Sequence, residues 1–137
     1  MSEKVLPESY WLNEFIEAHK PAPFRPIAYY DKHLDCIRVE LRACSVTEHR
    51  CGQFFTLLED NNPEADQTRF IGFTIKGVWH LFAELGLPLT GVQEVVAILN
   101  ALLEKYTQEL APAEKGLAEI RPILRDTELK IDFAQAA

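Results

Sequence analysis

Two thiols and an imidazole lie within a stretch of eight residues, a grouping that binds a transition metal in many proteins. Cys44 and Cys51 enclose His49, and zinc prefers thiolate and imidazole ligands. A closed zinc site uses close pairs of such residues at both of its ends, and no second pair follows along this chain. We therefore predict that the protein holds no metal and no cofactor, with Cys36, Cys44 and Cys51 as reduced thiols.

Positively charged side chains in the same region suggest an anion-binding site. Arg38 and Arg42 share one predicted strand, and His49 follows in the next segment. The three would converge if the strand folded back beside that segment, so they are the candidate ligand-binding residues. Pairing with Glu40 and Glu48 on neighbouring strands is the competing interpretation, and it is favoured because opposite charges commonly pair across a sheet.

Two groups of acidic side chains resemble functional sites but fit turns better. Acidic and amide side chains alternate through residues 60–66 like the first ligands of a calcium loop, yet Ala65 and Ile71 stand where that loop needs glycine and glutamate. A weak cation site is the alternative to a solvated hairpin loop here. Asp31 and Asp35 flank a turn, where aspartates bond to backbone N–H groups more often than they transfer protons.

The composition indicates one ordinary globular domain. The chain has 137 residues, of which 47% are hydrophobic and 26% charged, and this length can bury one sizeable core. Its net charge of -7 repels nucleic acid at long range, so nucleic acid is a disfavoured partner. No apolar run approaches the ~20 residues of a membrane helix, and the start of the chain lacks a secretory signal. We therefore expect a cytoplasmic protein without a membrane partner.

The N-terminal region is predicted to form an amphipathic helix over residues 8–20. Trp11, Phe15 and neighbouring apolar side chains recur there at helical spacing. The prolines of residues 21–26 cannot continue a helix, because each lacks a backbone N–H and restricts the residue before it. A stiff connector should follow the helix.

The apolar period changes to two between residues 27 and 76, which is typical of strands with one buried face. We predict strands at residues 27–30, 36–42, 53–59 and 69–75. Short connections favour neighbouring strands, so an antiparallel meander is the simplest topology.

The C-terminal half is predicted to be mostly helical. Residues 78–85 form a short apolar helix, and residues 91–110 carry an apolar stripe that predicts a long one. Pro122 interrupts a last helical stretch over residues 114–125, and the alternation of residues 129–133 indicates a short strand.

The order of these elements predicts the α+β class, with an antiparallel sheet of about four strands packed against one long helix and two or three shorter ones. Residues 1–137 are expected to form a single domain. Within it, residues 1–24 hold the N-terminal helix and connector, 25–76 the strands, 77–126 the helices and 127–137 the tail.

Two of the strand patterns resemble a known family. Residues 30–35 read Tyr-Asp-Lys-His-Leu-Asp before an alternating strand, and residues 69–75 read Arg-Phe-Ile-Gly-Phe-Thr-Ile after an acidic turn. Over residues 27–76 this pattern resembles a family of small uncharacterised bacterial proteins with a domain of unknown function and a Tyr-Asp-x-x-x-Asp opening. The loop at residues 60–68 is longer than the tight turn of that family. The resemblance implies a piece of fold and a bacterial source, and it implies no activity.

Signals of fold are abundant in this sequence and signals of catalysis are few. It has no glycine-rich phosphate loop, no His-Glu-x-x-His segment and no nucleophile elbow. We therefore predict a non-enzymatic protein–protein interaction or regulatory module that forms a homodimer or binds another protein. Its interaction surface would be Phe54, Phe55 and Leu58 on an uncovered sheet face. The alternative is a small enzyme or ligand-binding protein whose anion site uses the basic residues named above.

Overall fold

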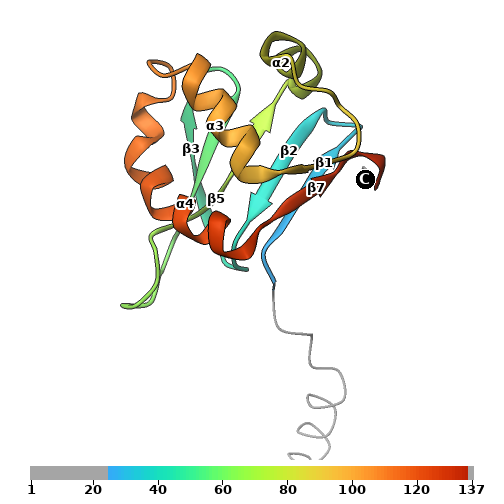
Figure 1. Ribbon diagram of the computed structural model, residues 1–137. Coiled ribbons are helices and arrows are strands. Elements are labelled where there is room, and N and C mark those ends of the chain that lie inside the picture. Colours follow the sequence, from blue (N-terminus) through green and yellow to red (C-terminus); the bar gives the residue numbers. More distant parts are fainter. Residues whose placement is uncertain (1–24, 136–137) are drawn as a thin grey trace, which may run out of the picture.

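The computed structural model describes residues 25–135, which form an antiparallel sheet with helices packed against one of its faces (Figure 1). This arrangement confirms the predicted α+β class. The helix predicted for residues 8–20 lies outside the described residues.

The main sheet has five strands, one more than the sequence predicted. They are β1 (Ile27–Asp31), β2 (Cys36–Glu40), β3 (Val46–Cys51), β4 (Phe55–Asp60) and β5 (Phe70–Lys76). Their order across the sheet is β1-β2-β5-β4-β3, and all neighbours are antiparallel. The expected meander is therefore wrong, because β5 lies between β2 and β4 and the chain crosses to the far edge before β3.

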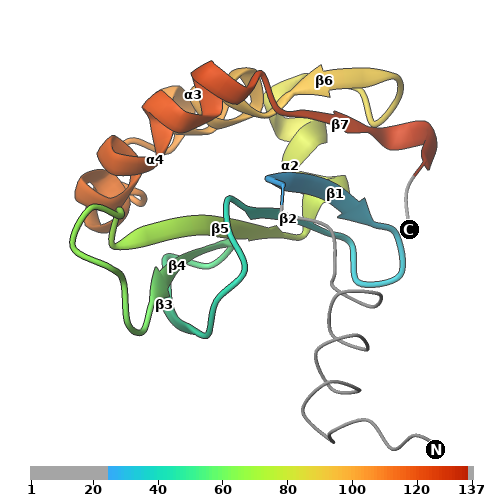
Figure 2. The same ribbon diagram turned by 90° about the horizontal axis from the view of Figure 1, so that it is seen from below.

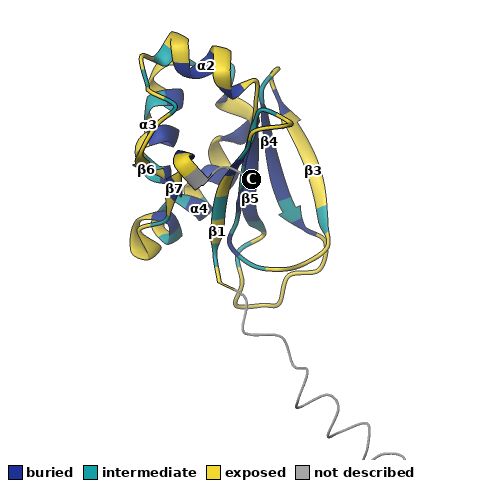
Figure 3. Cartoon of the chain, turned by 90° about the vertical axis from the view of Figure 1, so that its right-hand side faces the viewer, coloured by how far each residue is buried: buried dark blue, intermediate teal, exposed yellow. Residues whose placement is uncertain are grey.

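The additional strand, β3, forms one edge of the sheet. Its four central residues are exposed, and only Cys51 at its end is buried. A strand with polar residues on both faces has no apolar alternation for sequence analysis to detect, and charged edge strands of this kind discourage aggregation. Pairing with β4, from Val46 opposite Asp60 to Cys51 opposite Phe55, holds β3 in place. Figure 3 shows β3 as an exposed edge beside the buried strand β4.

The hydrophobic core lies between the sheet and the helices. Ile37 of β2 pairs with Ile75 of β5, and Val39 pairs with Phe73. Phe55 of β4 stacks on Phe73 with ring centroids 5.1 Å apart. All five side chains are buried, so the predicted alternation of β2 is confirmed at the positions that face the helices.

The central strands approach one another closely at Gly72 of β5. A Cβ atom there would lie 2.0 Å from the carbonyl oxygen of Val39, which leaves no room for any other residue. Leu58 lies opposite Gly72 across a register irregularity between β4 and β5, and it is fully buried. Strands β2, β5 and β4 therefore pack closely at Gly72, and the side chain of Leu58 opposite it is out of contact with water.

Three helices lie over the same face of the sheet (Figure 2). They are α2 (Val78–Leu85), α3 (Val95–Lys105) and α4 (Glu114–Thr127). Within the described part of the chain, no helix is long and apolar enough to cross a membrane. At Gly116 the backbone of α4 comes close to the sheet, because a Cβ atom there would lie 2.3 Å from a methyl carbon of Leu57.

The long helix that the sequence predicted over residues 91–110 is shorter in the structure. Its first turn is replaced by β6 (Val92–Glu94), which pairs with β7 (Lys130–Asp132) in a second, two-stranded sheet. The backbone groups of β6 thus bond to the tail rather than within a helix. Two 3-10 turns, Ala111–Ala113 and Phe133–Gln135, complete the elements of residues 25–135.

Pro122 does not interrupt the last helix, in contrast to the prediction. It lies inside α4, which runs on to Thr127. The missing N–H removes one helical hydrogen bond, but Leu117, Ile120 and Leu124 on either side of it are buried against the core. Burial of these side chains outweighs the lost bond.

Candidate functional site

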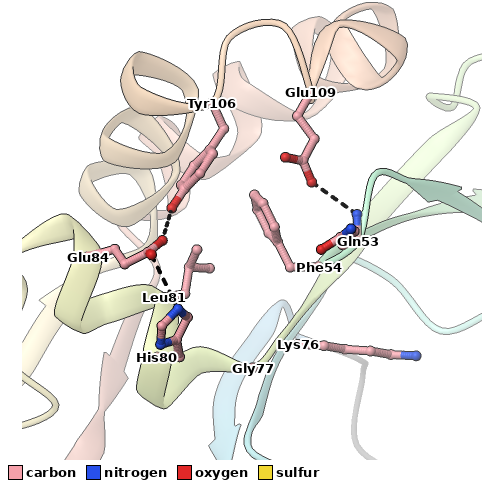
Figure 4. Close-up of a pocket in the computed structure, with 9 residues that line it drawn as sticks. All are labelled: Gln53, Phe54, Lys76, Gly77, His80, Leu81, Glu84, Tyr106 and Glu109. Carbon is pink, nitrogen blue, oxygen red and sulfur yellow. Dashed lines mark hydrogen bonds and ion pairs between the residues drawn. The ribbon is translucent and has the colours of Figure 1, made fainter.

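An open cleft of about 410 Å³ lies at the end of the sheet where β5 passes into α2. Four segments form it: the β3–β4 turn, the end of β5, α2, and the chain that follows α3 (Figure 4). Its lining includes Gln53, Phe54, Lys76, His80, Leu81, Glu84, Tyr106 and Glu109. The cleft thus combines aromatic and charged side chains.

One wall of the cleft is aromatic. The rings of Phe54 and Tyr106 meet edge to face with centroids 4.9 Å apart, and both are half-buried. Phe54 comes from the turn before β4, and Tyr106 caps the C-terminal end of α3. Leu81 of α2 is buried beside them. The wall is thus held by three separate elements and presents a fixed apolar surface.

Glu84 supplies the first charged group of the cleft. The hydroxyl of Tyr106 donates a hydrogen bond to its Oε1 atom at 2.6 Å, and the Nε2 atom of His80 lies 3.2 Å from its Oε2 atom. Lys105 donates to the backbone oxygen of Glu84 at 3.0 Å. The hydrogen bond from Tyr106 lowers the pKa of Glu84, and the same bond raises the pKa of Tyr106 to about 12.

Glu109 supplies the second charged group. Its Oε2 atom accepts a hydrogen bond from the backbone N–H of Gln53 at 3.0 Å, which ties the β3–β4 turn to the chain after α3. The turn passes through Gly52 with a φ of 77°, a conformation that favours glycine. A Cβ atom on Gly52 would lie 2.5 Å from the Cγ atom of Glu109, so the carboxylate packs directly on the glycine.

The cleft therefore presents two positioned carboxylates beside an aromatic wall. In Figure 4 the carboxylates of Glu84 and Glu109 lie on either side of Phe54, while the side chain of Lys76 extends away from them. Each carboxylate accepts its closest hydrogen bond from an uncharged donor. Such a site suits a cation attached to an apolar stem, because the stem can pack on the rings while the charge meets the carboxylates.

The structure does not bring the three predicted anion-site residues together. Arg38 forms an ion pair with Glu40 on its own strand. In the strand register Arg38 lies opposite Thr74, whereas His49 lies opposite Leu57 on the helix-covered side. Residues in adjacent positions of a strand point to opposite faces, so these two basic groups belong to different faces of the sheet.

Arg42 and His49 each have a carboxylate partner of their own. Two nitrogens of Arg42, Nε and Nη2, donate to the Oδ2 atom of Asp60 at 3.1 and 2.8 Å, and Nη1 donates to the hydroxyl of Thr68 at 3.0 Å. The Nε2 atom of His49 lies 2.5 Å from the Oε1 atom of Glu59. These contacts describe local ion pairing, the interpretation that the sequence favoured, although with other partners.

The predicted interaction surface requires a correction. Phe55 and Leu58 are fully buried, the former against the helix-side core and the latter inside the opposite side of the sheet. Phe54 is half-buried in the aromatic wall of the cleft. Adjacent apolar residues of β4 point to both faces of the sheet, and the side chains on both faces are buried at this strand.

None of the three cysteines lines this cleft. Cys36 is half-buried, Cys44 is exposed and Cys51 is buried, and all three are free thiols. Burial raises the pKa of each thiol, which keeps it in the unreactive protonated form at neutral pH. Over residues 25–135, no three His, Cys, Asp or Glu side chains gather in an arrangement that could hold a metal ion.

Sequence reasoning missed most of the cleft. Phe54 belongs to the predicted interaction surface, and His80 and Glu84 share a helix face because they are four residues apart. Gln53 comes from a segment far from Tyr106 and Glu109 in the chain, and nothing in their local sequence indicates that these residues meet Glu84.

Comparison with protein-family models, with curated proteins and with solved structures found no match for this chain. The resemblance of residues 27–76 to a bacterial family of unknown function therefore stays a prediction. The function of the protein is therefore inferred from the residues and geometry of the cleft.

Proposed function

We propose that the protein is a non-enzymatic interaction module that binds a lysine or arginine side chain of a partner protein in the cleft between α2 and α3. The observation that carries this proposal is the pair of carboxylates, Glu84 and Glu109, oriented by Tyr106 and by a backbone N–H on either side of an aromatic wall.

The chemistry of a basic side chain matches this surface. Lysine and arginine carry an apolar stem that packs on aromatic rings and a charged head that pairs with carboxylates. The net charge of -7 attracts basic segments over a longer range and raises the rate of encounter. A partner that presents a basic loop or tail would therefore be preferred over a neutral or acidic one.

The protonation states support binding rather than catalysis. A general acid or base works best with a pKa near the operating pH. The pKa of Glu84 is lowered and that of Tyr106 is raised to about 12, so the first stays ionised and the second stays protonated at neutral pH. These are the states that attract a cation and hold it.

Self-association was predicted from an exposed patch that two of its three residues cannot form, since Phe55 and Leu58 are buried. The proposal therefore names a basic partner protein. A homodimer stays a prediction, to be measured by light scattering on a size-exclusion column.

The proposal can be tested by titrating the labelled protein with two blocked tripeptides, Gly-Arg-Gly and Gly-citrulline-Gly, and recording backbone amide shifts. Citrulline has the shape of arginine without its charge. We expect the arginine peptide to shift the amides around Phe54 and Glu109, and the citrulline peptide to shift them far less. Equal shifts from both peptides, or shifts confined to other surfaces, would contradict the proposal.

A matched variant separates charge from structure. Glu109→Gln retains an acceptor for the N–H of Gln53 but removes the negative charge. We expect it to weaken binding of the arginine peptide by about tenfold, in the range of a lost pairing with a charged group. Unchanged affinity in this variant would exclude Glu109 from the site.

A further inference from the structure

A second cavity, of about 360 Å³, lies on the other side of α2 from the cleft. It is formed by the β1–β2 turn, the first turn of α2, the loop after α2 and the 3-10 turn Phe133–Gln135. Three aromatic rings, one leucine and one charged residue of each sign line it: Tyr30, Trp79, Phe133, Leu89, Asp35 and Lys32.

The aromatic rings of this cavity are held in place by other parts of the core. The centroids of Tyr30 and Phe133 are 5.5 Å apart with a 52° tilt, and Phe133 meets Phe82 edge to face at 5.5 Å. Tyr30 and Phe133 are nearly buried, whereas Trp79 is 72% exposed. A tryptophan left so exposed beside two anchored rings presents an open aromatic face to a ligand.

Asp35 places a carboxylate among these rings. The hydroxyl of Tyr30 donates to its Oδ1 atom at 2.7 Å, and the backbone N–H of Trp79 donates to Oδ1 at 3.0 Å and to Oδ2 at 3.3 Å. Asp35 has a φ of 52°, a left-handed conformation that is uncommon outside glycine. The N–H of Val78 donates to its backbone oxygen at 3.2 Å, so the residue is fixed from both sides.

Asp35 differs from an ordinary turn aspartate because its carboxylate accepts hydrogen bonds from two other elements of the fold. Asp31, at the other end of the same turn, accepts bonds from the N–H groups of His33 and Leu34, which is the turn role expected of both aspartates. The side chain of Asp35 instead bridges β1 to α2. Its donors are a hydroxyl and an amide, which orient the carboxylate without neutralising it.

The cavity holds one carboxylate, that of Asp35, and one ammonium, that of Lys32. Burial and the hydrogen bond to Asp35 raise the pKa of Tyr30 to about 12, and the charges of Asp35 and, more weakly, Asp31 add to this shift. Lys32 carries the opposing charge, and it lies on the exposed turn. A mobile ammonium on a flexible stem can turn toward water, whereas the carboxylate of Asp35 is fixed.

We infer that this cavity binds an alkylammonium group, with a quaternary ammonium head as its best ligand, through the exposed face of Trp79 and the carboxylate of Asp35, beside the anchored rings of Tyr30 and Phe133. Aromatic rings attract such cations through their negative faces, and a quaternary ammonium needs no hydrogen bonds from its site. Asp35 adds the charge that a neutral aromatic pocket lacks. This site is separate from the cleft and does not depend on the function proposed for it.

The experiment is a titration of the full chain with choline and, separately, with 3,3-dimethylbutan-1-ol. The alcohol has the same shape as choline but carries a carbon in place of the charged nitrogen. The signal is the indole N–H resonance of Trp79, assigned by its loss in Trp79→Leu. We expect choline to shift it saturably, with an affinity at least about tenfold above that of the alcohol, since cation–π pairing with a carboxylate nearby exceeds apolar contact by this much.

Two variants sharpen the test. Trp79→Leu keeps an apolar side chain at an exposed position and should weaken choline binding by about fivefold or more, measured through the amide of Asp35. Lys32→Gln removes the opposing charge and should strengthen choline binding by about twofold to fivefold. Circular dichroism melts establish that both variants fold.

Three results would overturn the inference: no saturable shift with choline, equal affinity for the alcohol, or loss of choline binding in Glu109→Gln. The last variant changes only the cleft, so it separates the two sites. If the arginine peptide fails to bind the cleft while choline still shifts Trp79, the proposed function fails and this inference stands.

Discussion

The carboxylates at the two ends of the sheet are held in different ways. Where β4 ends, Asp60 accepts two hydrogen bonds from the guanidinium of Arg42, at 2.8 and 3.1 Å. Where β4 begins, Glu109 accepts a backbone N–H and Glu84 accepts the hydroxyl of Tyr106. At the first end the carboxylate of Asp60 is joined to a guanidinium, whereas the second end positions Glu84 and Glu109 with uncharged donors.

This difference separates structural charges from charges that can serve a ligand. A carboxylate paired with a guanidinium has little charge left to offer, and removing either partner leaves the other uncompensated. A carboxylate held by a hydroxyl or an amide is oriented in advance and still attracts a cation. The basic neighbours of Glu84 are the imidazole of His80, which is 81% exposed in its side chain, and Lys105, which bonds to the backbone oxygen of Glu84 rather than to its carboxylate. Asp35 is held in the same way as Glu84 and Glu109, because its donors are a hydroxyl and a backbone amide.

The largest effect is expected from breaking the sheet that separates the two ends. Gly72→Val would place side-chain atoms where a Cβ alone lies 2.0 Å from the carbonyl oxygen of Val39. We expect a loss of about 3 kcal/mol or more in the free energy of unfolding, as for other overpacked core positions. Urea unfolding measures it, with Lys76→Ala on the same strand as an exposed control. A silent Gly72→Val would show that β2 and β5 are spaced more widely.

The next largest effect should come from the structural end. Arg42→Gln removes the cation that pairs with Asp60 and the donor to Thr68. We expect the melting temperature to fall by about 5 °C, a typical response for a domain of this size to a lost buried pair. A thermal melt followed by circular dichroism checks it. A melting temperature equal to that of the wild type would show that the pair of Arg42 and Asp60 contributes no more to stability than the carboxylates of the cleft do.

The corresponding change at the other end should affect binding more than stability. Glu84→Gln keeps an acceptor for Tyr106 and removes the charge. We expect its melting temperature to stay within about 2 °C of the wild type, since exposed substitutions rarely do more. Binding of the arginine tripeptide should weaken by about fivefold to tenfold. If Glu84→Gln lowers the melting temperature but leaves binding of the tripeptide unchanged, the cleft carboxylate is structural and does not serve a ligand.

Acid should destabilise the protein through carboxylates at both ends. The N–H of Asn62 and the guanidinium of Arg42 lower the pKa of Asp60, and Tyr106 lowers that of Glu84. A carboxyl group whose pKa is lower in the folded state than in the unfolded state stabilises the fold at any pH above its unfolded-state pKa. This stabilisation is lost as the pH falls through the folded-state pKa. The loss should therefore begin below about pH 4. Melts from pH 7 to pH 2 should show a smaller acid-linked loss in Arg42→Gln than in the wild type.

The smallest expected effect concerns the tyrosines. Burial and a hydrogen bond to Asp35 raise the pKa of Tyr30 to about 12, and a hydrogen bond to Glu84, with a smaller effect of burial, raises that of Tyr106 to about 12. The stability linked to a raised pKa is present below the unfolded value and is lost as the pH rises through the folded one. Phenolate absorbance should show a late ionisation near pH 12 that is reduced, and not abolished, in Tyr106→Phe. Its complete loss in that variant would place Tyr30 outside the influence of Asp35.

Patterns within short segments were enough to predict the α+β class and most elements. The alternation of Ile37 and Val39 and the apolar character of α2 depend on residues a few positions apart, and both are confirmed. The stripe of α3 is confirmed in its buried residues, which include Leu99 and Leu102. Its predicted start failed, because Val92 is 59% exposed on β6 and pairs with a strand about forty residues away.

Contacts between distant segments decided the rest. The polar sequence of β3 becomes a strand because β4 supplies its hydrogen-bonding partners, and the order of the strands depends on where β5 inserts. The cleft joins Gln53, Glu84 and Glu109, and the aromatic cavity joins Tyr30 to Phe133 across the whole described chain. Local periodicity reports which side chains are buried, but a site assembled from separate segments exists only once the core has packed them together.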